Sequence, residues 1–403
     1  MKLAREFRLR WDSVLLPPTR AITLTILPIL SLSITLLSVM IGLGFIRAIH
    51  IVKSLAPAAP IGSETPLVDV IVPARNEQAD VGNAVRSILA QQGVDVRITV
   101  INDHSTDQTG SLVDRIAEND PRVGVIHDPP MMDGWFGKAN AMQHAYQTTN
   151  RPYVVFADAD VIHSPCCFIT AIDHMRQEQC DFLSLFPKVQ LVSFWENAIV
   201  PHLMVFGLVT FLNRALDDPN SGHAVAAGAF MLTRRNVLDE IGGLACVRNE
   251  ALDDVMLARN IKANGFVTKI ALAPQLLSVR LFKSNHDAFW GFSKNILGAV
   301  SHIAFAFPAI VVPLFVYWLP ISVLLIGIVR HDGGWMLCGI SAYVTQAAIL
   351  VLASRLAEMH PLKALAFPFS ALPIGCCFAR AIYHHFISDG VVWRGRVIRR
   401  STN

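Results

Sequence analysis

Long apolar runs alternate with a central region of mixed pattern. Four runs are almost without charged side chains: 21–46, 295–329, 333–354 and 364–387. Only the last contains a charged residue, Arg380, with two histidines near its end. A helix of roughly 20 apolar residues crosses a hydrocarbon core of about 30 Å. We therefore predict a transmembrane anchor over 21–50 and a C-terminal region of about three spans over 299–388.

The region between the first two runs, residues 65–298, has a different pattern. Short β-branched runs alternate with helical patterns, which is typical of a parallel α/β sheet. The predicted strands are 68–72, 97–101, 123–126, 153–157 and 182–186, and the predicted helices are 77–92, 106–118, 138–148 and 165–178. A Pro- and Ser-containing stretch, 56–66, is predicted to link the anchor to this domain. The pattern thus predicts one soluble α/β domain inserted between membrane segments.

The segment 194–212 is apolar but carries Trp195, Glu196 and His202. Pro201 is expected to bend a helix there. Two interpretations stay open, an interfacial helix lying against the bilayer and a buried core helix.

Composition favours a membrane protein and argues against other classes. Hydrophobic residues make up 53% of the chain and charged residues 16%, which is more apolar than an ordinary soluble protein. The seven cysteines lack C-x-x-C spacing, so we predict neither a zinc site nor a disulfide framework. The net charge of +3, without a basic groove interleaved with aromatic residues, predicts no nucleic-acid partner.

Polar side chains follow three of the predicted strands. In an open α/β sheet, ligands bind beyond the carboxyl ends of the strands. The residues concerned are Asn76 and Glu77 in VIVPARNE, Asp103 and Asp107 in ITVINDHSTD, and Asp158 and Asp160 in VVFADAD. For Asp107, helix N-capping is the alternative interpretation.

The D-x-D pair, Asp158 and Asp160, places two like charges at the end of a buried strand. Such charges are costly unless a cation compensates them. Carboxylate oxygens suit Mg²⁺ or Mn²⁺, and either ion can bridge a diphosphate. A loop with two solvated carboxylates is the other interpretation.

Six motifs occur in the order and spacing of family-2 glycosyltransferases. They are PARNE (73–77), NDHSTDQT (102–109), GWFGKANAM (134–142), FADAD (156–160), AAGAFMLTRR (226–235) and EALDDVMLARNIKANG (250–265). The sequence resembles this family over nearly all of residues 68–298, which implies an A-type, Rossmann-like nucleotide-binding domain. It looks most like membrane-bound members acting on lipids, namely hopene-associated and carotenoid glycosyltransferases and, more distantly, ceramide glucosyltransferase.

The resemblance implies roles for individual residues. The positions that match the nucleoside contacts are Pro73, Asn76, Glu77 and Asp103. Asn102 departs from the aspartate that is more usual before Asp103. Asp158 and Asp160 match the carboxylates that hold the metal and the diphosphate. Lys138, near a predicted helix start, is expected to counter diphosphate charge, with an exposed lysine as the alternative.

Inverting sugar transfer needs a base that takes the proton of the acceptor hydroxyl. Asp253 and Asp254 match the family's acidic pair, whose second member is the base, so Asp254 is the predicted base. The same two acids also suit the first turn of a helix over 253–264, where the helix dipole favours negative charge and Gly265 supplies the C-cap.

Processive synthases carry Q-x-x-R-W after the base, whereas the corresponding region here, 286–298, reads HDAFWGFSKNILG. This departure favours transfer of one sugar to one acceptor. Trp290, Lys294 and Asn295 share one helical face and, with Asp253, are candidates for contact with the acceptor or the membrane. An interfacial anchor is the alternative role for Trp290.

The terminal charges conflict with the expected orientation. The basic N-terminal segment 1–20 and the basic tail 389–403 predict that both termini are cytoplasmic. One span before the domain and three after it would then place the domain outside. Nucleotide sugars are cytosolic, and 295–329 is too long for one simple span. We therefore expect an integral protein of the inner cell membrane with a cytoplasmic catalytic domain.

Together these observations predict an inverting, hexosyltransferase-type enzyme. It would use a nucleotide sugar, of UDP type, with Mg²⁺ or Mn²⁺, and add a single sugar to a hydroxyl of a hopanoid, carotenoid or glycolipid. A polysaccharide synthase and a non-catalytic nucleotide-binding membrane scaffold are the alternatives.

Overall fold

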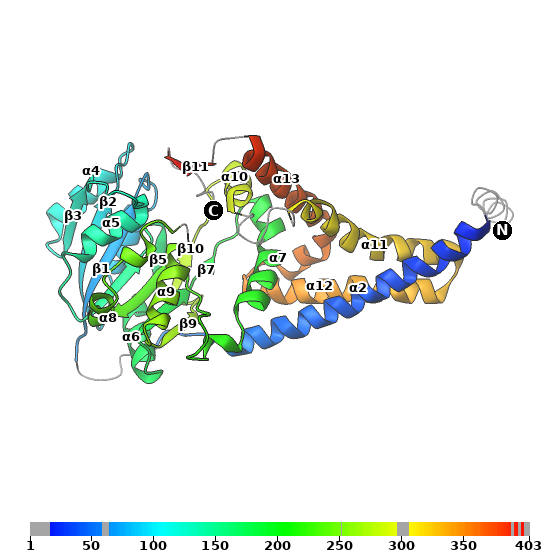
Figure 1. The fold of residues 1–403 in the computed structure, drawn as a ribbon, viewed down its shortest axis with the longest axis horizontal. Helices are drawn as coiled ribbons and strands as arrows, with labels where there is room; N and C mark the ends of the chain where they lie inside the picture. The colour runs from blue at the N-terminus through cyan, green and yellow to red at the C-terminus, as the bar shows by residue number, and fades with distance from the viewer. Residues whose placement is uncertain are drawn as a thin grey trace.

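A mixed β-sheet domain lies at one end of the long axis of the molecule, and apolar helices extend from it (Figure 1). The computed structural model describes residues 17–58, 64–250, 252–295, 306–387, 391–393 and 396–398. Most of the predicted basic segments, 1–20 and 389–403, lies outside these ranges, as does part of the predicted linker 56–66.

Seven strands form the central sheet, in the order β3-β2-β1-β4-β8-β6-β9. Their bounds are β1 Leu67–Ala74, β2 Asp95–Asn102, β3 Val123–His127, β4 Tyr153–Ala157, β6 Phe182–Phe186, β8 Phe230–Arg234 and β9 Thr268–Leu272. The first four strands pair in parallel, and β6 and β9 do so too. β8 runs antiparallel to both β4 and β6, so the prediction of a purely parallel sheet is wrong at this strand. A short buried apolar run has the same pattern in either direction.

Helices cover both faces of this sheet because side chains alternate along each strand. Val70 and Val72 face a core shared with α3 and α6, whereas Ile71 and Phe156 face a core shared with α5, α8 and α9. The helix bounds are α3 Val81–Leu89, α4 Thr109–Asn119, α5 Gly137–Tyr146, α6 Cys167–Gln177, α8 Arg235–Glu240 and α9 Asp253–Ala263, with short 3₁₀ turns at η1 Arg214–Leu216 and η2 Ala245–Val247.

A second, three-stranded sheet continues directly from the D-x-D pair. Its strands are β5 Val161–His163, β10 Leu277–Val279 and β7 Lys188–Val189, in the order β5-β10-β7. The chain leaves β10 toward α10, Asn285–Asn295. The second sheet thereby connects the end of β4 with the apolar helices.

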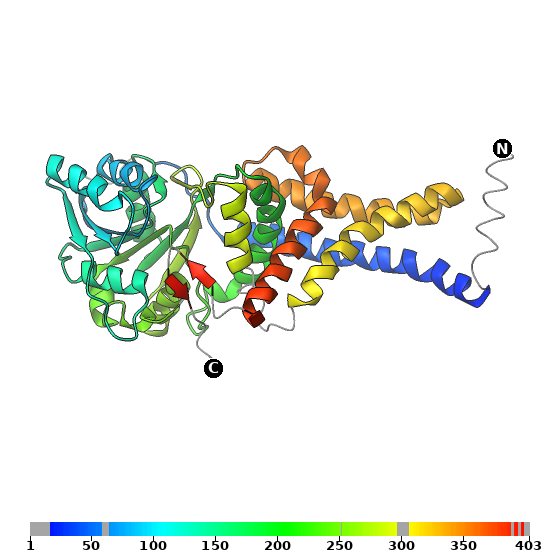
Figure 2. The ribbon, with the colours of Figure 1, turned by 90° about the horizontal axis from the view of Figure 1, so that it is seen from above.

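The apolar helices differ in direction. Their bounds are α2 Pro17–Ile51, α7 Phe194–Phe211, α11 Pro308–Arg330, α12 Gly333–Leu356, η5 Pro361–Ser370 and α13 Ala371–Ile387, and a hairpin of β11 Val391–Trp393 and β12 Arg396–Ile398 follows. α2, α11 and α12 extend away from the domain, whereas α7, α10 and α13 lie beside it and run across the long axis in Figure 2. α7 continues through Pro201 as one helix.

Five helical segments of the described ranges are long and apolar enough to cross a membrane: Ile26–Ile51, Phe194–Phe211, Pro308–Arg330, Gly333–Leu356 and Pro361–Phe386. The domain is joined to the first of them at the sheet edge, where Leu55 N donates a 2.7 Å hydrogen bond to Leu272 O in β9. The residues just after α2 thus pair with the sheet before the linker begins.

Candidate active site

The D-x-D pair lies at the carboxyl end of β4, where Asp158 pairs with a lysine. Lys138 Nζ, in the first turn of α5, donates a 2.8 Å hydrogen bond to Asp158 Oδ1. The same ammonium lies 3.8 Å from Asp253 Oδ2. The Lys138 side chain is 39% exposed, as in the alternative interpretation, but it also bridges two acidic motifs.

Four motifs meet at Gly228, just before β8. Gly228 N donates a 2.8 Å hydrogen bond to Asp254 Oδ2. A Cβ at this position would lie 3.3 Å from Lys138 Nζ and 3.5 Å from both Asp158 Oδ2 and Asp254 Oδ2. The pairing of Ala157 with Phe230 explains the encounter, since antiparallel strands bring the residues after β4 and before β8 together. The three charged groups therefore line the backbone at Gly228.

Asp253 and Asp254 occupy the first turn of α9, as the helix interpretation expected. Asp254 Oδ1 accepts a 2.8 Å hydrogen bond from Val255 N, and Asp253 Oδ2 is buried without a hydrogen-bond donor in the described part of the chain. Both carboxylates nevertheless turn toward Lys138 and Gly228. The first-turn position and a place in the site are thus compatible.

The site perturbs the pKa of two of its groups. Burial raises the pKa of Asp254, the charge of Asp253 raises it further, and the charge of Lys138 opposes both. For Lys138, burial lowers the pKa, but Asp158 and Asp253 outweigh this effect and raise it well above the ordinary value. Lys138 is therefore a permanent cation, while Asp254 ionises less readily than an ordinary aspartate.

The residues after β1 brace the loop after β2. Asn76 has a positive φ of 54°, and its Oδ1 accepts a 2.8 Å hydrogen bond from Thr106 N. Glu77 N donates to Thr109 Oγ1 at 2.8 Å. Pro73, in β1, is half-buried opposite Ile101 of β2. The predicted nucleoside residues Pro73, Asn76 and Glu77 thus lie together at the carboxyl edge of β1.

Asp107 lies two residues before the start of α4, whose N-cap is Gln108 without a side-chain cap hydrogen bond, so the capping interpretation of Asp107 is wrong. Its Oδ1 accepts a 2.9 Å hydrogen bond from Thr109 N, and its Oδ2 accepts a 3.2 Å bond from Gln78 N. Both bonds hold the two strand-end loops together, so Asp107 acts in the structure as a turn residue.

Asp103 is buried at the end of β2 beside two residues that sequence reasoning missed. His104 Nδ1 lies 3.0 Å from Asp103 Oδ1, and Arg75 Nη1 donates a 2.8 Å hydrogen bond to Asp103 O. Arg75 is part of the motif PARNE, which was the available signal. Asn102, the departure from the usual aspartate, contacts His127 of β3 at 3.1 Å.

The acceptor candidates on α10 are separate from the carboxylates. Trp290 is 45% exposed, and its ring neighbours are His286, Arg380 and His384. Lys294 and Asn295 lie in the last turn of α10, and only their backbone is described. Arg380 was noticed only as an interruption of an apolar run, although a lone charge there is itself a signal.

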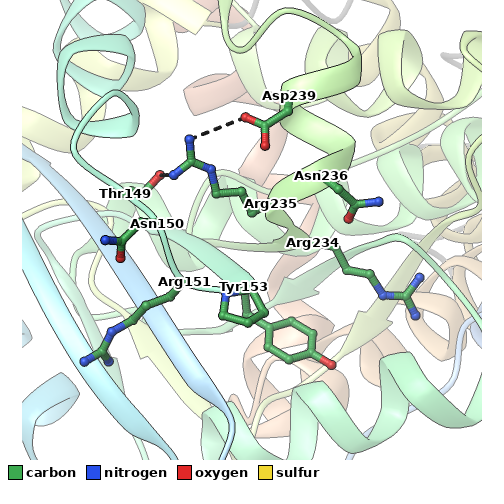
Figure 3. A pocket seen from close by; sticks show the side chains of 9 residues that line it. Thr149, Asn150, Arg151, Tyr153, Arg234, Arg235, Asn236 and Asp239 are labelled. Atoms are coloured by element: carbon green, nitrogen blue, oxygen red, sulfur yellow. Dashed lines mark hydrogen bonds and ion pairs between the residues drawn. The ribbon is translucent and has the colours of Figure 1, made fainter.

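A cavity of about 660 Å³ lies at the amino end of β4, away from the D-x-D pair (Figure 3). Its walls are Thr149–Tyr153, before and into β4, and Arg234–Asp239, after β8. Arg234 pairs with Asp181 at 2.6 Å and Arg235 with Asp239 at 3.4 Å. Because its cations are already paired and the D-x-D pair lies at the other end of β4, this cavity is not the site described above.

Metal-binding side chains are few in the described ranges, where no three His, Cys, Asp or Glu residues gather as a ligand set. Asp158 and Asp160 remain as half-buried carboxylates one residue apart. Mg²⁺ commonly takes one or two carboxylates and completes its shell with phosphate oxygens and water. The residues thus fit a cation that is held jointly with a diphosphate.

Comparison with known proteins places this geometry in a family. Residues 69–242 match the model of glycosyl transferase family 2. Among curated relatives, the 4,4'-diaponeurosporenoate glycosyltransferase of Staphylococcus aureus (strain MRSA252) is 27% identical over 235 residues, which is 56% of this chain and 60% of the relative. The uncharacterized glycosyltransferase EpsJ of Bacillus subtilis (strain 168) is 29% identical over 118 residues, 29% of this chain and 33% of that protein. The chain thus spans less than two thirds of the length of these relatives.

Solved structures resemble the chain at low identity. The mannosyltransferase PcManGT from Pyrobaculum calidifontis, in complex with GDP-Man and Mn²⁺, is 18% identical at a TM-score of 0.49, over 86% of this chain and 97% of that one. Glucosyl-3-phosphoglycerate synthase from Mycobacterium tuberculosis, with Mn²⁺ and UDP, is 19% identical at a TM-score of 0.38, over 54% and 72%. TM-scores below 0.5 carry no argument, so the description of the fold rests on the strand order alone.

The predicted α/β, Rossmann-like A-type fold between apolar helices and the predicted family are both confirmed. Residues 69–242 match the model of glycosyl transferase family 2, so this part of the chain is a glycosyltransferase family 2 domain.

Proposed function

We propose that the chain is a membrane-bound inverting glycosyltransferase that moves one sugar from a nucleotide-sugar donor to a hydroxyl of a membrane lipid. The observation that carries this proposal is the meeting of Lys138, Asp158 and Asp254 at Gly228, in a domain whose one side is covered by apolar helices. The relative named for diaponeurosporenoate supports a lipid acceptor.

The donor would lie across the carboxyl ends of β1, β2 and β4. Pro73, Asn76, Glu77 and Asp103 lie where the nucleoside would bind, and Lys138 supplies a fixed positive charge for the diphosphate. Asp158 and Asp160 would hold Mg²⁺ or Mn²⁺ together with phosphate oxygens. When bound, the ion neutralises negative charge that develops on the departing diphosphate. UDP is the donor nucleotide that we propose.

The chemical step assigns one role to Asp254. The acceptor hydroxyl oxygen attacks the anomeric carbon, the bond from that carbon to the diphosphate oxygen breaks, and Asp254 takes the hydroxyl proton. The Gly228 N–H holds Asp254 Oδ2 in one orientation through its 2.8 Å hydrogen bond. Attack from the face opposite the leaving diphosphate inverts the anomeric configuration.

Labelled donors test this function directly. Membranes containing the full chain are incubated with a panel of labelled nucleotide sugars, and extracted lipids are analysed by mass. We expect one hexose on one lipid with a single preferred donor, and none with the Asp254→Asn variant. Products with several sugars would favour a polysaccharide synthase, and donor binding without any transfer would favour a nucleotide-binding scaffold.

The acid side of the pH–rate profile should report Asp254. A base must be ionised, and burial together with Asp253 raises the pKa of Asp254, so kcat/KM should fall with an apparent pKa above the ordinary 3.8. The Asp253→Asn variant lacks the neighbouring negative charge, so its kcat/KM should fall at a lower pH than that of the parent. A profile that does not move, or moves to higher pH, would contradict this assignment.

The direction of the helices suggests which of them span the membrane. We propose that α2, α11 and α12 cross the bilayer, and that α7 and α13 lie at its surface beside the domain. Three crossings put the domain and the β11–β12 hairpin on one side, the cytoplasm of the inner membrane, and the start of α2 on the other.

Reporter fusions check this topology. A reporter before Met1 should be active outside and one after Asn403 inside. This result would agree with the positive-inside rule for the basic tail but not for the N-terminal segment. Both reporters on the same side would overturn the arrangement with three spans.

A further inference from the structure

Arg380 of α13 lies against two aromatic rings of α10. Its guanidinium carbon is 3.1 Å from the centroid of the Trp290 ring and 5.2 Å from that of Phe289. Both contacts are of the cation–π type, which holds an arginine by its flat face and leaves the edges of the guanidinium for hydrogen bonds.

One of those edges has no partner. Arg380 Nη2 is buried and donates no hydrogen bond in the described part of the chain, nor does any carboxylate there form an ion pair with Arg380. An unpaired charged donor in apolar surroundings is costly, so its retention calls for a ligand. A guanidinium with free edges suits a carboxylate or a phosphate, which accept two parallel hydrogen bonds.

The nearest charged and titratable groups favour an anion. His384 of α13 lies 5.9 Å and His286 of α10 lies 5.6 Å from the Trp290 ring, measured between ring centroids. The only nearby acid on α10 that the contacts include is Asp287, half-exposed and facing His286. Arg380 is therefore the fixed cation of an aromatic cluster whose acid, Asp287, faces His286.

The segment that carries the aromatic pair is tied to the donor edge of the sheet. Lys283, just before α10, forms a 2.6 Å ion pair with Asp80 at the start of α3, close to Glu77. β10, just before Lys283, pairs with β5, which follows Asp160. Both views place α10 and α13 between the domain and the long helices (Figures 1 and 2). A molecule held at Arg380 would thus lie between the donor and the apolar layer.

We infer that Arg380, framed by Phe289 and Trp290, binds an anionic group of the lipid acceptor, a carboxylate or a phosphate, while the apolar part of the lipid lies along the helices. This inference rests on the proposed function, because it names the chemical class of that acceptor. Arg380 is in this view a specificity-determining residue, and it takes no part in proton transfer.

Equilibrium binding to the full chain in phosphatidylcholine nanodiscs tests the inference. The probes are hexadecanoic acid, hexadecyl phosphate and the neutral methyl hexadecanoate. Arg380→Gln should weaken binding of an anionic probe about 10- to 100-fold, since hydrogen bonds to a charged group are worth a few kcal/mol, and should leave the methyl ester unchanged. The anionic probe that loses more affinity, hexadecanoic acid or hexadecyl phosphate, identifies the anionic group that Arg380 binds.

The matched control is Arg330→Gln. Arg330 also lies over a tryptophan, with its guanidinium carbon 5.5 Å from the ring centroid of Trp335, but it ends α11 at the turn far from the domain (Figure 1). This variant should bind all three probes as the parent does. If Arg380→Gln fails to fold, Arg380→Lys serves instead, because it keeps the positive charge and the aliphatic stem. Its affinity for the anionic probes should still fall several-fold, because lysine cannot donate two parallel hydrogen bonds.

The outcomes separate this site from the proposed function. Equal losses for the ester and the acid, or no loss for either, would overturn the anion site. Transfer to an anionic lipid at the parent rate in Arg380→Gln would also overturn it while leaving the transferase intact. Arg380-dependent anion binding without transfer from any donor would instead refute the proposed function and retain the site.

Discussion

Asp254→Asn should abolish sugar transfer while donor binding stays close to that of the parent. Asparagine keeps the shape and can still accept the Gly228 N–H bond, but it cannot take the acceptor proton. Loss of general base catalysis typically costs about 10²- to 10⁴-fold, and we expect kcat to fall by that much. Turnover with labelled donor and calorimetric titration with the nucleotide diphosphate measure the two quantities.

Asp253→Asn is the matched control, since it changes the neighbouring acid in the same helical turn. It should retain most of the turnover at neutral pH. Transfer by Asp254→Asn within a few fold of the parent would show that Asp254 is not the base.

Thermal stability distinguishes the base from a helix-capping acid. The pKa of Asp254 is raised in the folded state, so ionisation of this group costs folding free energy at every pH above that pKa. Asparagine resembles the neutral form but accepts only one of the two N–H bonds from Gly228 and Val255, so the gain and the loss offset each other and Asp254→Asn should melt close to the parent at neutral pH. A first-turn acid that only stabilises the helix dipole would give a lower melting temperature instead.

Asp158→Asn should remove the metal dependence of donor binding and reduce kcat/KM by roughly 10²-fold or more, the range seen when an electrostatic stabiliser of a transition state is lost. The reason is that Asp158 is expected to hold the cation that bridges the diphosphate. Titration of the nucleotide diphosphate with and without Mg²⁺ measures the effect. The parent should bind more tightly with the metal, and the variant should not distinguish the two conditions.

Two further variants complete this test. Lys138→Met removes the cation that contacts Asp158 and should weaken donor binding while leaving the response to Mg²⁺ intact. Asp217→Asn removes an acid paired with Lys269 at an exposed position and should change neither quantity. If Mg²⁺ still tightened binding to both Asp158→Asn and Asp160→Asn, the D-x-D pair would not be the metal site.

Periodicity predicted the strands of the parallel half of the sheet closely, because a fully buried strand needs a continuous apolar run that few other elements share. The first strand was predicted over 68–72 and extends over Leu67–Ala74, and the fourth has the predicted bounds. β8 was missed although its motif had been noticed. The residues Phe230–Thr233 are buried like those of a parallel strand, and nothing in a local pattern records which neighbour a strand will pair with.

The candidate site likewise combines features visible in the sequence with contacts that only tertiary packing creates. Each acidic motif was visible in the sequence as a carboxylate after an apolar run. The contact of Lys138 with Asp158 and Asp253 was not visible, because it joins residues on α5, β4 and α9 that are far apart along the chain. The unpaired edge of Arg380 against Trp290 likewise depends on how α13 packs on α10.

The sequence by itself determined the class of fold, the family of the central domain and the candidate site residues, because apolar periodicity and motif spacing are local properties. Only the tertiary structure decided the antiparallel place of β8, the meeting of Lys138, Asp158 and Asp254 at Gly228, and the direction of the apolar helices. The physical reason is that charge pairing and burial act through space. A raised pKa or an unsatisfied donor exists only once distant segments have packed together.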